Sequence, residues 1–192
     1  MNPLRKKLIV AFIAAGLSAP AAYVGYDLTL PSEGLVLAPY SDPVGLKTYC
    51  VGHLATKKDV LKKSYTEEEC MKIFAEDFKK HQTETDKMVG GKYASEWQRG
   101  ALTDMTFNNG PSLIEKSTMI SLVKQGKHVE ACDQLIRWVY AKGKKLGGLV
   151  KRRDKTMPYC LGELSYEKQK DYADFLKEYN DEVKNQKAKL DK

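Results

Sequence analysis

The sequence predicts an α+β domain in which a small β-hairpin or meander lies on a mainly helical body. Three observations support this: a turn-rich stretch with strand-forming residues at positions 32–53, helical periodicity from Thr66 onward, and distinct apolar and charged segments at the two ends. The chain has 192 residues, of which 42% are hydrophobic and 30% are charged. This length and composition allow one compact core and exclude a large multidomain enzyme and a wholly disordered chain. We expect an N-terminal segment over residues 1–26, a folded domain over 27–164 and a C-terminal helix over 165–192.

The N-terminal segment has the pattern of an export signal. Residues 5–7 are all basic, and residues 8–25 contain no charge. As a helix, residues 8–25 would reach about 27 Å, slightly less than the roughly 30 Å of a bilayer's hydrocarbon core. The second half of this stretch is mostly Ala, Gly, Ser and Pro, which bury little area, so the span would be weak. Two interpretations stay open: a signal peptide cleaved near Ala-Pro-Ala at 19–21, or an uncleaved anchor, basic end in the cytoplasm, that later leaves the membrane.

The next stretch, residues 32–53, has strand and turn signals. Gly and Pro recur through it and supply turns, whereas Thr48, Tyr49 and Val51 favour an extended backbone. We therefore expect a β-hairpin or a small meander ahead of the helices.

Helical signals dominate after residue 65. Thr66 precedes three glutamates, which is the pattern of an N-cap followed by acids in the first turn, and Ser95 precedes a second apolar helical pattern. The sequence Asn-Asn-Gly-Pro at 108–111 ends that second helix. The predicted helices cover residues 66–85, 95–108, 117–125, 128–140 and 144–154.

The C-terminal residues 165–192 differ in composition from the rest. They contain seven Lys and seven acids, so their net charge is zero and the +7 of the whole chain belongs to the residues before them. Tyr172, Phe175 and Tyr179 fall at helical spacing, which predicts one amphipathic helix that packs on the domain and frays after Asn185. A coiled coil with a partner helix is the less favoured alternative, because the apolar positions cover fewer than three heptads.

Four cysteines, at positions 50, 70, 132 and 160, all follow the apolar segment. In an exported protein this even number predicts two disulfides. Three pairings are possible; the pairs Cys50–Cys70 and Cys132–Cys160 close two local loops, each worth about 3 kcal/mol on the chain-entropy model. Zinc would need a second close ligand pair beside Cys50 and His53, and none follows, so we expect neither a metal nor a cofactor.

The residues that point to chemistry are Glu33, Asp42 and Thr48. Glycoside hydrolysis needs one carboxylic acid to protonate the leaving oxygen and a second group, on the opposite face of the sugar, to handle water. In an inverting enzyme the two carboxyl groups lie about 6.5–9.5 Å apart, and a Thr hydroxyl is suited to orient the water. A Glu ahead of the hairpin and an Asp within it can face each other across a cleft. Acids in loops are more often solvated surface charges, so two acids and a Thr are weak evidence alone.

The spacing of these residues belongs to a longer and more specific pattern. Eight residues separate Glu33 from Asp42, and five separate Asp42 from Thr48. The matching positions are Glu33-Gly34, Tyr40, Asp42-Pro43, Gly45, Thr48 and Gly52-His53, followed by Arg99–Leu102, Phe107–Gly110, Ser117-Thr118, Gly126–Trp138, Gly148-Leu149 and Arg152-Arg153. The pattern resembles the phage-type lysozymes, glycoside hydrolase family 24, over about residues 32–162, and with the N-terminal segment it is similar to their signal-anchor-release endolysins.

The resemblance implies a lysozyme-like fold and hydrolysis of the β-1,4 bond between N-acetylmuramic acid and N-acetylglucosamine in bacterial peptidoglycan. It implies that Glu33 is the general acid, and that Asp42 stays ionised and holds the attacking water together with Thr48. A general acid must keep its proton near neutral pH, which partial burial of the carboxyl favours.

Three further positions match the family and are candidates for substrate binding: His53, Asn108 and Arg153. His53 resembles a position beside the cleft. For each of the three, a structural hydrogen-bonding role is the alternative interpretation.

The resemblance also implies where the protein acts. We expect a monomer exported to the periplasmic face of the host inner membrane, held there through residues 8–25 and then released to the periplasm. Glu33 lies eight residues after Gly25, so a membrane-embedded segment could hold it out of register with Asp42 and Thr48. Some anchored relatives are kept inactive by a disulfide between the catalytic set and the apolar segment. Because no cysteine precedes residue 50, that switch is not expected here.

Basic residues concentrate between positions 142 and 155, where seven Lys or Arg occur. They form either a solvated helix face or a surface that attracts the anionic cell wall. Nucleic acid is not expected as a partner, because no recognition motif accompanies the charge. Two rival functions stay open: a lytic transglycosylase, which would cleave the same bond with a single Glu, and an inactive membrane-tethered module that binds the wall.

Overall fold

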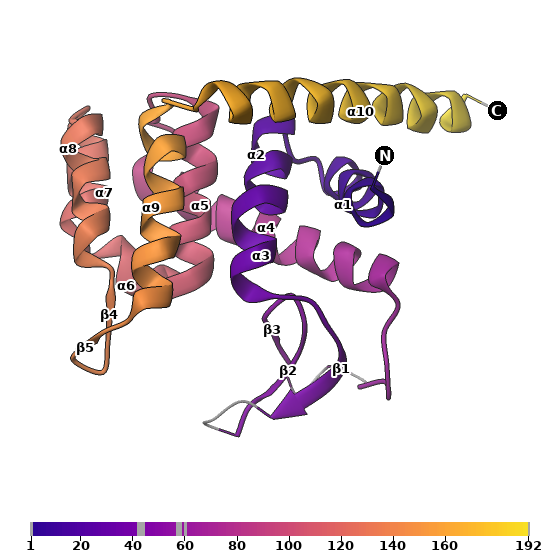
Figure 1. Cartoon of the computed structure of the whole chain (residues 1–192), viewed down its shortest axis with the longest axis horizontal. Helices are drawn as coiled ribbons and strands as arrows, with labels where there is room; N and C mark the ends of the chain where they lie inside the picture. Colours follow the sequence, from indigo (N-terminus) through magenta and orange to yellow (C-terminus); the bar gives the residue numbers. More distant parts are fainter. Residues whose placement is uncertain (1, 42–44, 57–58, 60, 192) are drawn as a thin grey trace.

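The body of the protein is built from helices that pack around α5 (Glu96–Asn109), which contacts α2, α4 and α9 (Figure 1). The computed structural model describes residues 2–41, 45–56, 59 and 61–191. The other elements are α1 (Pro3–Ala14), α2 (Ala19–Val24), the π-helix η1 (Gly25–Thr29), α3 (Leu30–Glu33), β1 (Val36–Ser41), β2 (Lys47–Cys50), β3 (His53–Leu54), α4 (Glu67–Val89), α6 (Pro111–Glu115), α7 (Thr118–Lys124), α8 (His128–Asp133), the 3-10 helix η2 (Gln134–Arg137), β4 (Tyr140–Ala141), β5 (Lys144–Lys145), α9 (Gly147–Leu161) and α10 (Tyr166–Leu190).

Strands β1, β2 and β3 form a small lobe below the helices in Figure 1, apart from the β4–β5 hairpin. β1, β2 and β3 make an antiparallel sheet in that order, with Tyr40 opposite Thr48 and Tyr49 opposite His53. This sheet confirms the predicted β-hairpin or meander, and the helices confirm the α+β class.

Local capping signals explain where the long helices begin. The side chains and backbones of Thr66 and Glu69 form a reciprocal capping box at the start of α4, and the Ser95 hydroxyl caps α5. Two disulfides are present, as predicted, and of the three possible pairings the structure has Cys50–Cys70 and Cys132–Cys160. The first ties the end of β2 to α4, and the second ties α8 to α9.

Several predicted helix boundaries are wrong. The helix expected over 128–140 ends at Asp133 and gives way to η2, and the residues that follow pair as strand β4 with β5. Lys144 and Lys145 therefore belong to a short hairpin, and α9 begins only after them. The left-handed Gly143, whose φ is 74°, provides the turn that separates these strands. α4 continues past residue 85 to Val89, and α9 continues past residue 154 to Leu161. The predicted C-terminal helix is present as α10 and extends to Leu190.

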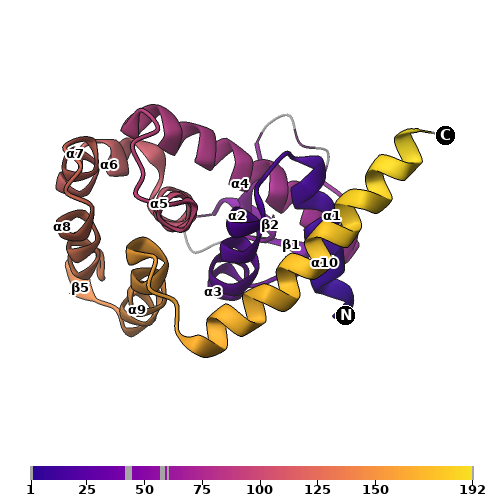
Figure 2. The same cartoon turned by 90° about the horizontal axis from the view of Figure 1, so that it is seen from above.

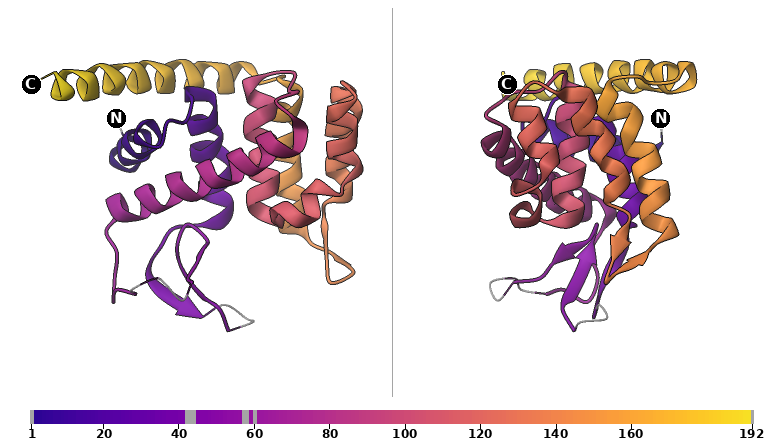
Figure 3. Two further views of the ribbon diagram at one scale, coloured as in Figure 1. Left: turned by 180° about the vertical axis from the view of Figure 1, so that it is seen from behind. Right: turned by 90° about the vertical axis from the view of Figure 1, so that its left-hand side faces the viewer.

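The N-terminal segment fills part of the core. Leu8, Phe12 and Leu28 are completely or almost completely buried, and α1 lies between α4 and α10 when the molecule is seen from behind (Figure 3). Gly16, with φ of 70°, breaks the apolar stretch into two helices. In the described part of the chain, no helix combines the length and apolar character needed to cross a membrane.

Helix α10 covers this segment from outside. Seen from above, it crosses α1 and passes beside α2 (Figure 2). Phe175 is fully buried beneath it, which confirms an amphipathic helix packed on the domain.

Candidate active site

Glu33 lies at the end of a helical run that starts in α2. The run from Ala19 continues through η1 and α3 without a break, and Gly34, whose φ is 78°, then turns the chain into β1. A left-handed residue after a helix favours glycine, because it has no Cβ to clash. The side chain of Glu33 is 21% exposed, so its carboxyl group is partly buried at the junction of the helical body and the sheet.

A buried ionic network holds this carboxyl group. Arg152 in α9 donates from Nη1 to Oε1 of Glu33 at 2.6 Å, and from Nη2 and Nε to the two carboxylate oxygens of Asp104 at 2.7 and 3.3 Å. The hydroxyl of Thr29 in η1 donates to Oδ1 of Asp104 at 2.9 Å. Asp104 is fully buried in α5, and Arg152 is 6% exposed. The network therefore connects the helical run that ends at Glu33 with both α5 and α9.

The carboxylates of Asp104 and Glu33 compensate the positive charges of Arg152 and Arg153. Burial alone would lower the pKa of Arg152, but the carboxylates of Asp104 and Glu33 outweigh it and raise its pKa. Burial lowers the pKa of Arg153 to about 10, although Asp104 offsets part of the effect. Both guanidinium groups are thus protonated at neutral pH.

Gly52 brings the turn between β2 and β3 against Glu33. A Cβ atom at this position would lie 3.1 Å from Oε2 of Glu33, and the φ of Gly52 is 65°. The close approach and the left-handed backbone both favour glycine. Because the disulfide of Cys50 fixes the end of β2 to α4, the turn has a rigid support two residues away.

A groove of 530 Å³ opens beside Glu33. Its volume is in the range of small-molecule binding sites. Glu33 lies on one side, and Arg152 and Leu146 come from α9 and the residue before it. Polar and basic side chains contribute to the wall, namely Asn108, Lys151 and Lys155.

Thr48 lies in the central strand of the sheet, opposite Tyr40 in β1 and Leu54 in β3. It is 5% exposed, and its Oγ1 has no hydrogen-bond partner among the described residues. Buried hydroxyl groups are generally hydrogen-bonded, so this oxygen can accept a bond from, or donate one to, a water molecule. Asp42 lies outside the described residues.

The three predicted substrate-binding residues occupy different settings. Asn108 lines the groove and accepts a hydrogen bond from Arg153. Arg153 is 2% exposed and also donates from Nε to the carbonyl of Trp138 at 3.0 Å. This arrangement favours the structural alternative for Arg153 and leaves Asn108 able to contact a ligand.

His53 lies in β3 and interacts with a residue of α4 rather than with a residue of the groove wall. Its Nδ1 is 2.6 Å from Oδ2 of Asp77 in α4, and its ring packs edge-on against Tyr49. The hydrogen bond to Asp77 raises the pKa of His53, although burial opposes the shift. The pair ties the sheet to α4, which favours the structural alternative here too.

Sequence reasoning did not single out Arg152 and Asp104, which hold Glu33. The sequence does contain a signal for Asp104. It is a lone acid within the apolar helical pattern of Ala101, Leu102 and Met105, and an acid on a buried face needs a partner for its charge. The sequence places Arg152 in the family motif and in the basic stretch, and no local pattern indicates its partner.

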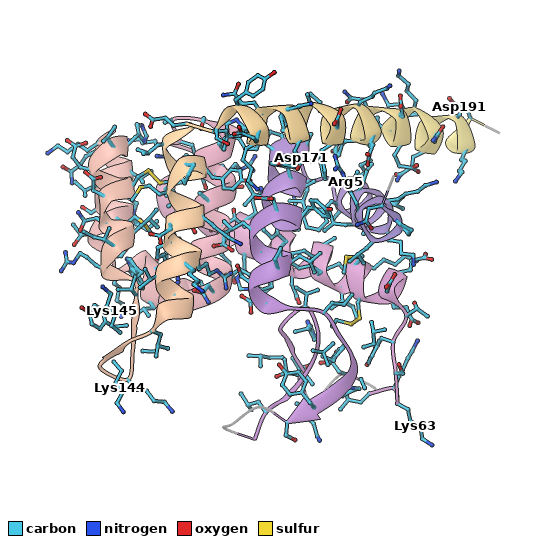
Figure 4. All side chains as sticks on the ribbon, in the orientation of Figure 1. Arg5, Lys63, Lys144, Lys145, Asp171 and Asp191 are labelled. Carbon is cyan, nitrogen blue, oxygen red and sulfur yellow. A yellow bond between two sulfur atoms is a disulfide. The ribbon has the colours of Figure 1, made fainter. Side chains whose placement is uncertain are left out.

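Basic residues surround this end of the molecule. Figure 4 labels Lys144 and Lys145, which form strand β5 of the β4–β5 hairpin and have exposed side chains. Lys151 and Lys155 continue the positive charge into the groove. Such a surface attracts anionic polymers. In the parts of the chain that are described, no group of three or more His, Cys, Asp or Glu side chains could hold a metal ion.

Comparison with known proteins gives concordant results. The family model for phage lysozyme matches residues 31–156. The SAR-endolysin of Enterobacteria phage P21 is 36% identical over 167 residues, covering 84% of this chain and 98% of that protein. The SAR-endolysin of Escherichia phage Mu is 32% identical over 161 residues, covering 82% of this chain and 92% of that protein. Among solved structures, the active form of the P1 phage endolysin Lyz superposes with a TM-score of 0.69 at 20% identity, covering 83% of this chain and 94% of that one. This last likeness concerns the fold and agrees with the predicted lysozyme-like arrangement.

Proposed function

Because the chain belongs to the phage lysozyme family, we propose that it is an endolysin that hydrolyses the β-1,4 bond between N-acetylmuramic acid and N-acetylglucosamine in peptidoglycan and so lyses the host cell of a bacteriophage. Its family and its SAR-endolysin relatives support a peptidoglycan-degrading enzyme. The observation that most supports the proposal is the position of Glu33, which is partly buried, fixed by Arg152 and open to a groove of 530 Å³.

In the proposed reaction Glu33 donates a proton to the glycosidic oxygen as the bond breaks. A water molecule attacks the anomeric carbon from the opposite face, and Asp42 accepts its proton. Thr48 orients that water, since its buried Oγ1 lacks a partner among the described residues. Arg152, which Asp104 holds in turn, fixes the position of the Glu33 carboxyl group, so the acid is pre-positioned for transfer.

Substitution of the acid tests this assignment. Glu33→Gln should reduce the release of reducing ends from purified peptidoglycan by about 100-fold or more, because general-acid catalysis is lost while the side-chain shape is kept. Glu115→Gln is the matched control, since Glu115 is exposed in α6. A Glu33→Gln protein that unfolds like the wild type and still degrades the wall at the wild-type rate would exclude Glu33 as the acid.

Product analysis separates the proposal from a transglycosylase. Hydrolysis adds water and leaves a reducing N-acetylmuramic acid, whereas a transglycosylase forms a 1,6-anhydro sugar that is lighter by one water. Mass spectrometry of the released muropeptides distinguishes the two. A protein that binds walls and releases neither product would instead be an inactive wall-binding module.

We further propose export to the periplasmic face of the inner membrane, with residues 8–25 as an uncleaved anchor that later joins the domain. The burial of Leu8 and Phe12 in the core supports retention, because cleavage after Ala21 would remove both side chains and expose the surfaces of α4 that they cover. The mass of the mature protein recovered from the periplasm tests this. A chain beginning at Ala22 would establish a cleaved signal peptide.

A further inference from the structure

A second surface cavity, of 370 Å³, lies on the opposite side of α9 from the groove beside Glu33. Positions 148, 151, 152 and 155 border the groove, and positions 150, 153, 154 and 157 border this cavity. Each set repeats with the spacing of one helix face, and the two sets are offset by about half a turn. The volume is in the range of small-molecule sites. The proposed hydrolysis does not use this cavity.

Apolar side chains form much of the cavity wall. Val150 and Met157 come from α9, and Val139, which follows η2, is almost completely buried. Ile136 of η2 also borders the cavity and is 69% exposed. A wall of this composition suits the methyl or methylene groups of a ligand.

Two side chains of opposite charge border the same cavity. Lys145 of β5 and Asp154 of α9 are both exposed, and neither forms an ion pair with another described residue. Arg153 adds a second positive charge. Its Nη1 has no hydrogen-bond partner in the described part of the chain and lies 3.9 Å from Oδ2 of Asp104. The two cations favour a carboxylate, and the acid favours an amino group.

The backbone of α9 adds a hydrogen-bond acceptor. Pro158 lies inside the helix and has no N–H, so the carbonyl of Asp154, four residues earlier, lacks its usual helical donor. Both residues border the cavity. The cavity therefore combines a cation for a carboxylate, an acid for an amino group, an acceptor for a peptide N–H and an apolar wall. This is the chemistry of a site for a short peptide.

The path from the groove to the cavity is short and open. The β4–β5 hairpin leads directly into α9 (Figure 1); Lys145 borders the cavity, and the next residue, Leu146, borders the groove. Gly147 and Gly148 follow, and a Cβ on either would have no atom within 4 Å. A helix is about 10–12 Å across with its side chains, and four extended residues reach about 13–14 Å. A peptide that starts in the groove can therefore end in the cavity.

We propose that this cavity binds the short peptide carried by the N-acetylmuramic acid unit in the groove. Such peptides have free carboxylates, the methyl groups of alanine and, where they are not cross-linked, the free amino group of a diamino acid. Lys145 binds a carboxylate, Asp154 binds the amino group, and the apolar wall covers the methyl groups. The identity of the sugar in the groove rests on the proposed function, whereas affinity for the peptide is a property of the cavity alone.

Titration of the full-length protein with a free peptide tests the site. The probe is the tripeptide of alanine, glutamate and diaminopimelate, and binding is followed by the amide NMR signals of the protein, with the largest shifts expected at Val139, Lys145 and Met157. Lys145→Gln removes the cation. Lys144→Gln is the matched control, since adjacent strand residues point to opposite faces and Lys144 is not part of the wall. The first variant should bind about tenfold more weakly than the second, because one charge-assisted bond is lost. Equal affinities would overturn the proposal.

A second pair of variants tests the cavity itself. Val150→Phe fills it with a larger side chain, and Val129→Phe is the control because Val129 is 60% exposed in α8. Val150→Phe should weaken the tripeptide about tenfold, and Val129→Phe should not. Asp154→Asn should weaken it several-fold, and acetylation of the amino groups of the tripeptide should abolish that difference. Unchanged affinity in Val150→Phe would place the peptide elsewhere and refute the assignment.

Hydrolysis of two substrates separates recognition of the peptide from a general attraction to the wall. On glycan strands that carry peptides, Lys145→Gln should raise KM several-fold over Lys144→Gln with kcat unchanged, and on strands stripped by an amidase the two should be equal. An equal loss on both substrates would show attraction of the polymer alone and contradict the proposal. Glu33→Gln should bind the tripeptide as the wild type does, so a protein that binds it without degrading the wall retains this inference and rejects the proposed function.

Discussion

Asp104→Asn is predicted to destabilise the protein strongly. The substitution keeps the shape of a fully buried side chain but removes the charge that faces Arg152, which donates to it at 2.7 and 3.3 Å. Removing one partner of a buried ion pair costs about 3–5 kcal/mol, because the other charge is left without compensation. Arg152 keeps its bond to Glu33, so we take the lower end, about 3 kcal/mol. For a chain of this size the midpoint of thermal unfolding should then fall by about 6–12 °C.

The control for this experiment is Asp154→Asn. Asp154 is exposed in α9, so the same change in charge should alter the midpoint by no more than about 2 °C. Thermal unfolding followed by circular dichroism compares the variants directly. Activity against peptidoglycan should also fall in Asp104→Asn at temperatures where it is folded, since Arg152, the partner of Glu33, is then held less firmly. Equal midpoints for the two variants would refute the view that this network stabilises the fold.

Three further substitutions or treatments have expected outcomes. In Gly100→Ala the new Cβ would lie 2.9 Å from Cγ2 of Val24, so α2 must move and we expect a loss of about 1–3 kcal/mol in chemical unfolding; Gly147→Ala, with no atom within 4 Å, should be nearly neutral. Because the hydrogen bond to Asp77 raises the pKa of His53, this pair stabilises the fold fully below about pH 6.5 and loses its effect as pH rises through the higher folded-state pKa. Asp77→Asn should therefore lower the unfolding midpoint more at about pH 5.5 than at about pH 9, and an equal loss at both would contradict this. Reduction of the two disulfides should lower the free energy of unfolding by about 3 kcal/mol for each loop, measured by urea unfolding with and without reductant. An unchanged free energy of unfolding would contradict the chain-entropy argument.

The features that the sequence predicts well depend on neighbouring residues. Thr66 and Ser95 lie next to the helices that they cap, and the turn residues of the sheet lie between the strands that they connect. The spacing from Glu33 to Thr48 identifies the family, since it is a property of one short segment. Signals of this kind are local, so they can be recognised without knowledge of the fold.

The features that the sequence does not predict depend on contacts between distant segments. Arg152 and Asp104 are 48 residues apart, and no local pattern pairs them. Lys144 and Lys145 form a strand because they pair with Tyr140 and Ala141 across a glycine turn, although the surrounding pattern suits a helix. Such pairings override intrinsic propensity.

The composition of the N-terminal segment suits two environments for different reasons. Small residues bury little apolar area each, so Ala21, Ala22 and Gly25 contribute weakly to insertion in a bilayer. In the folded domain the same small size permits close packing: a Cβ at Gly25 would lie 2.7 Å from the Phe12 ring, and Gly100 of α5 leaves similar room for Val24. Close approach of helices allows many weak contacts at once, which a fluid lipid chain does not provide. On the proposal that this segment is first anchored in a bilayer, weak insertion and tight packing would bias it toward the domain, where the helical run that it begins ends at Glu33.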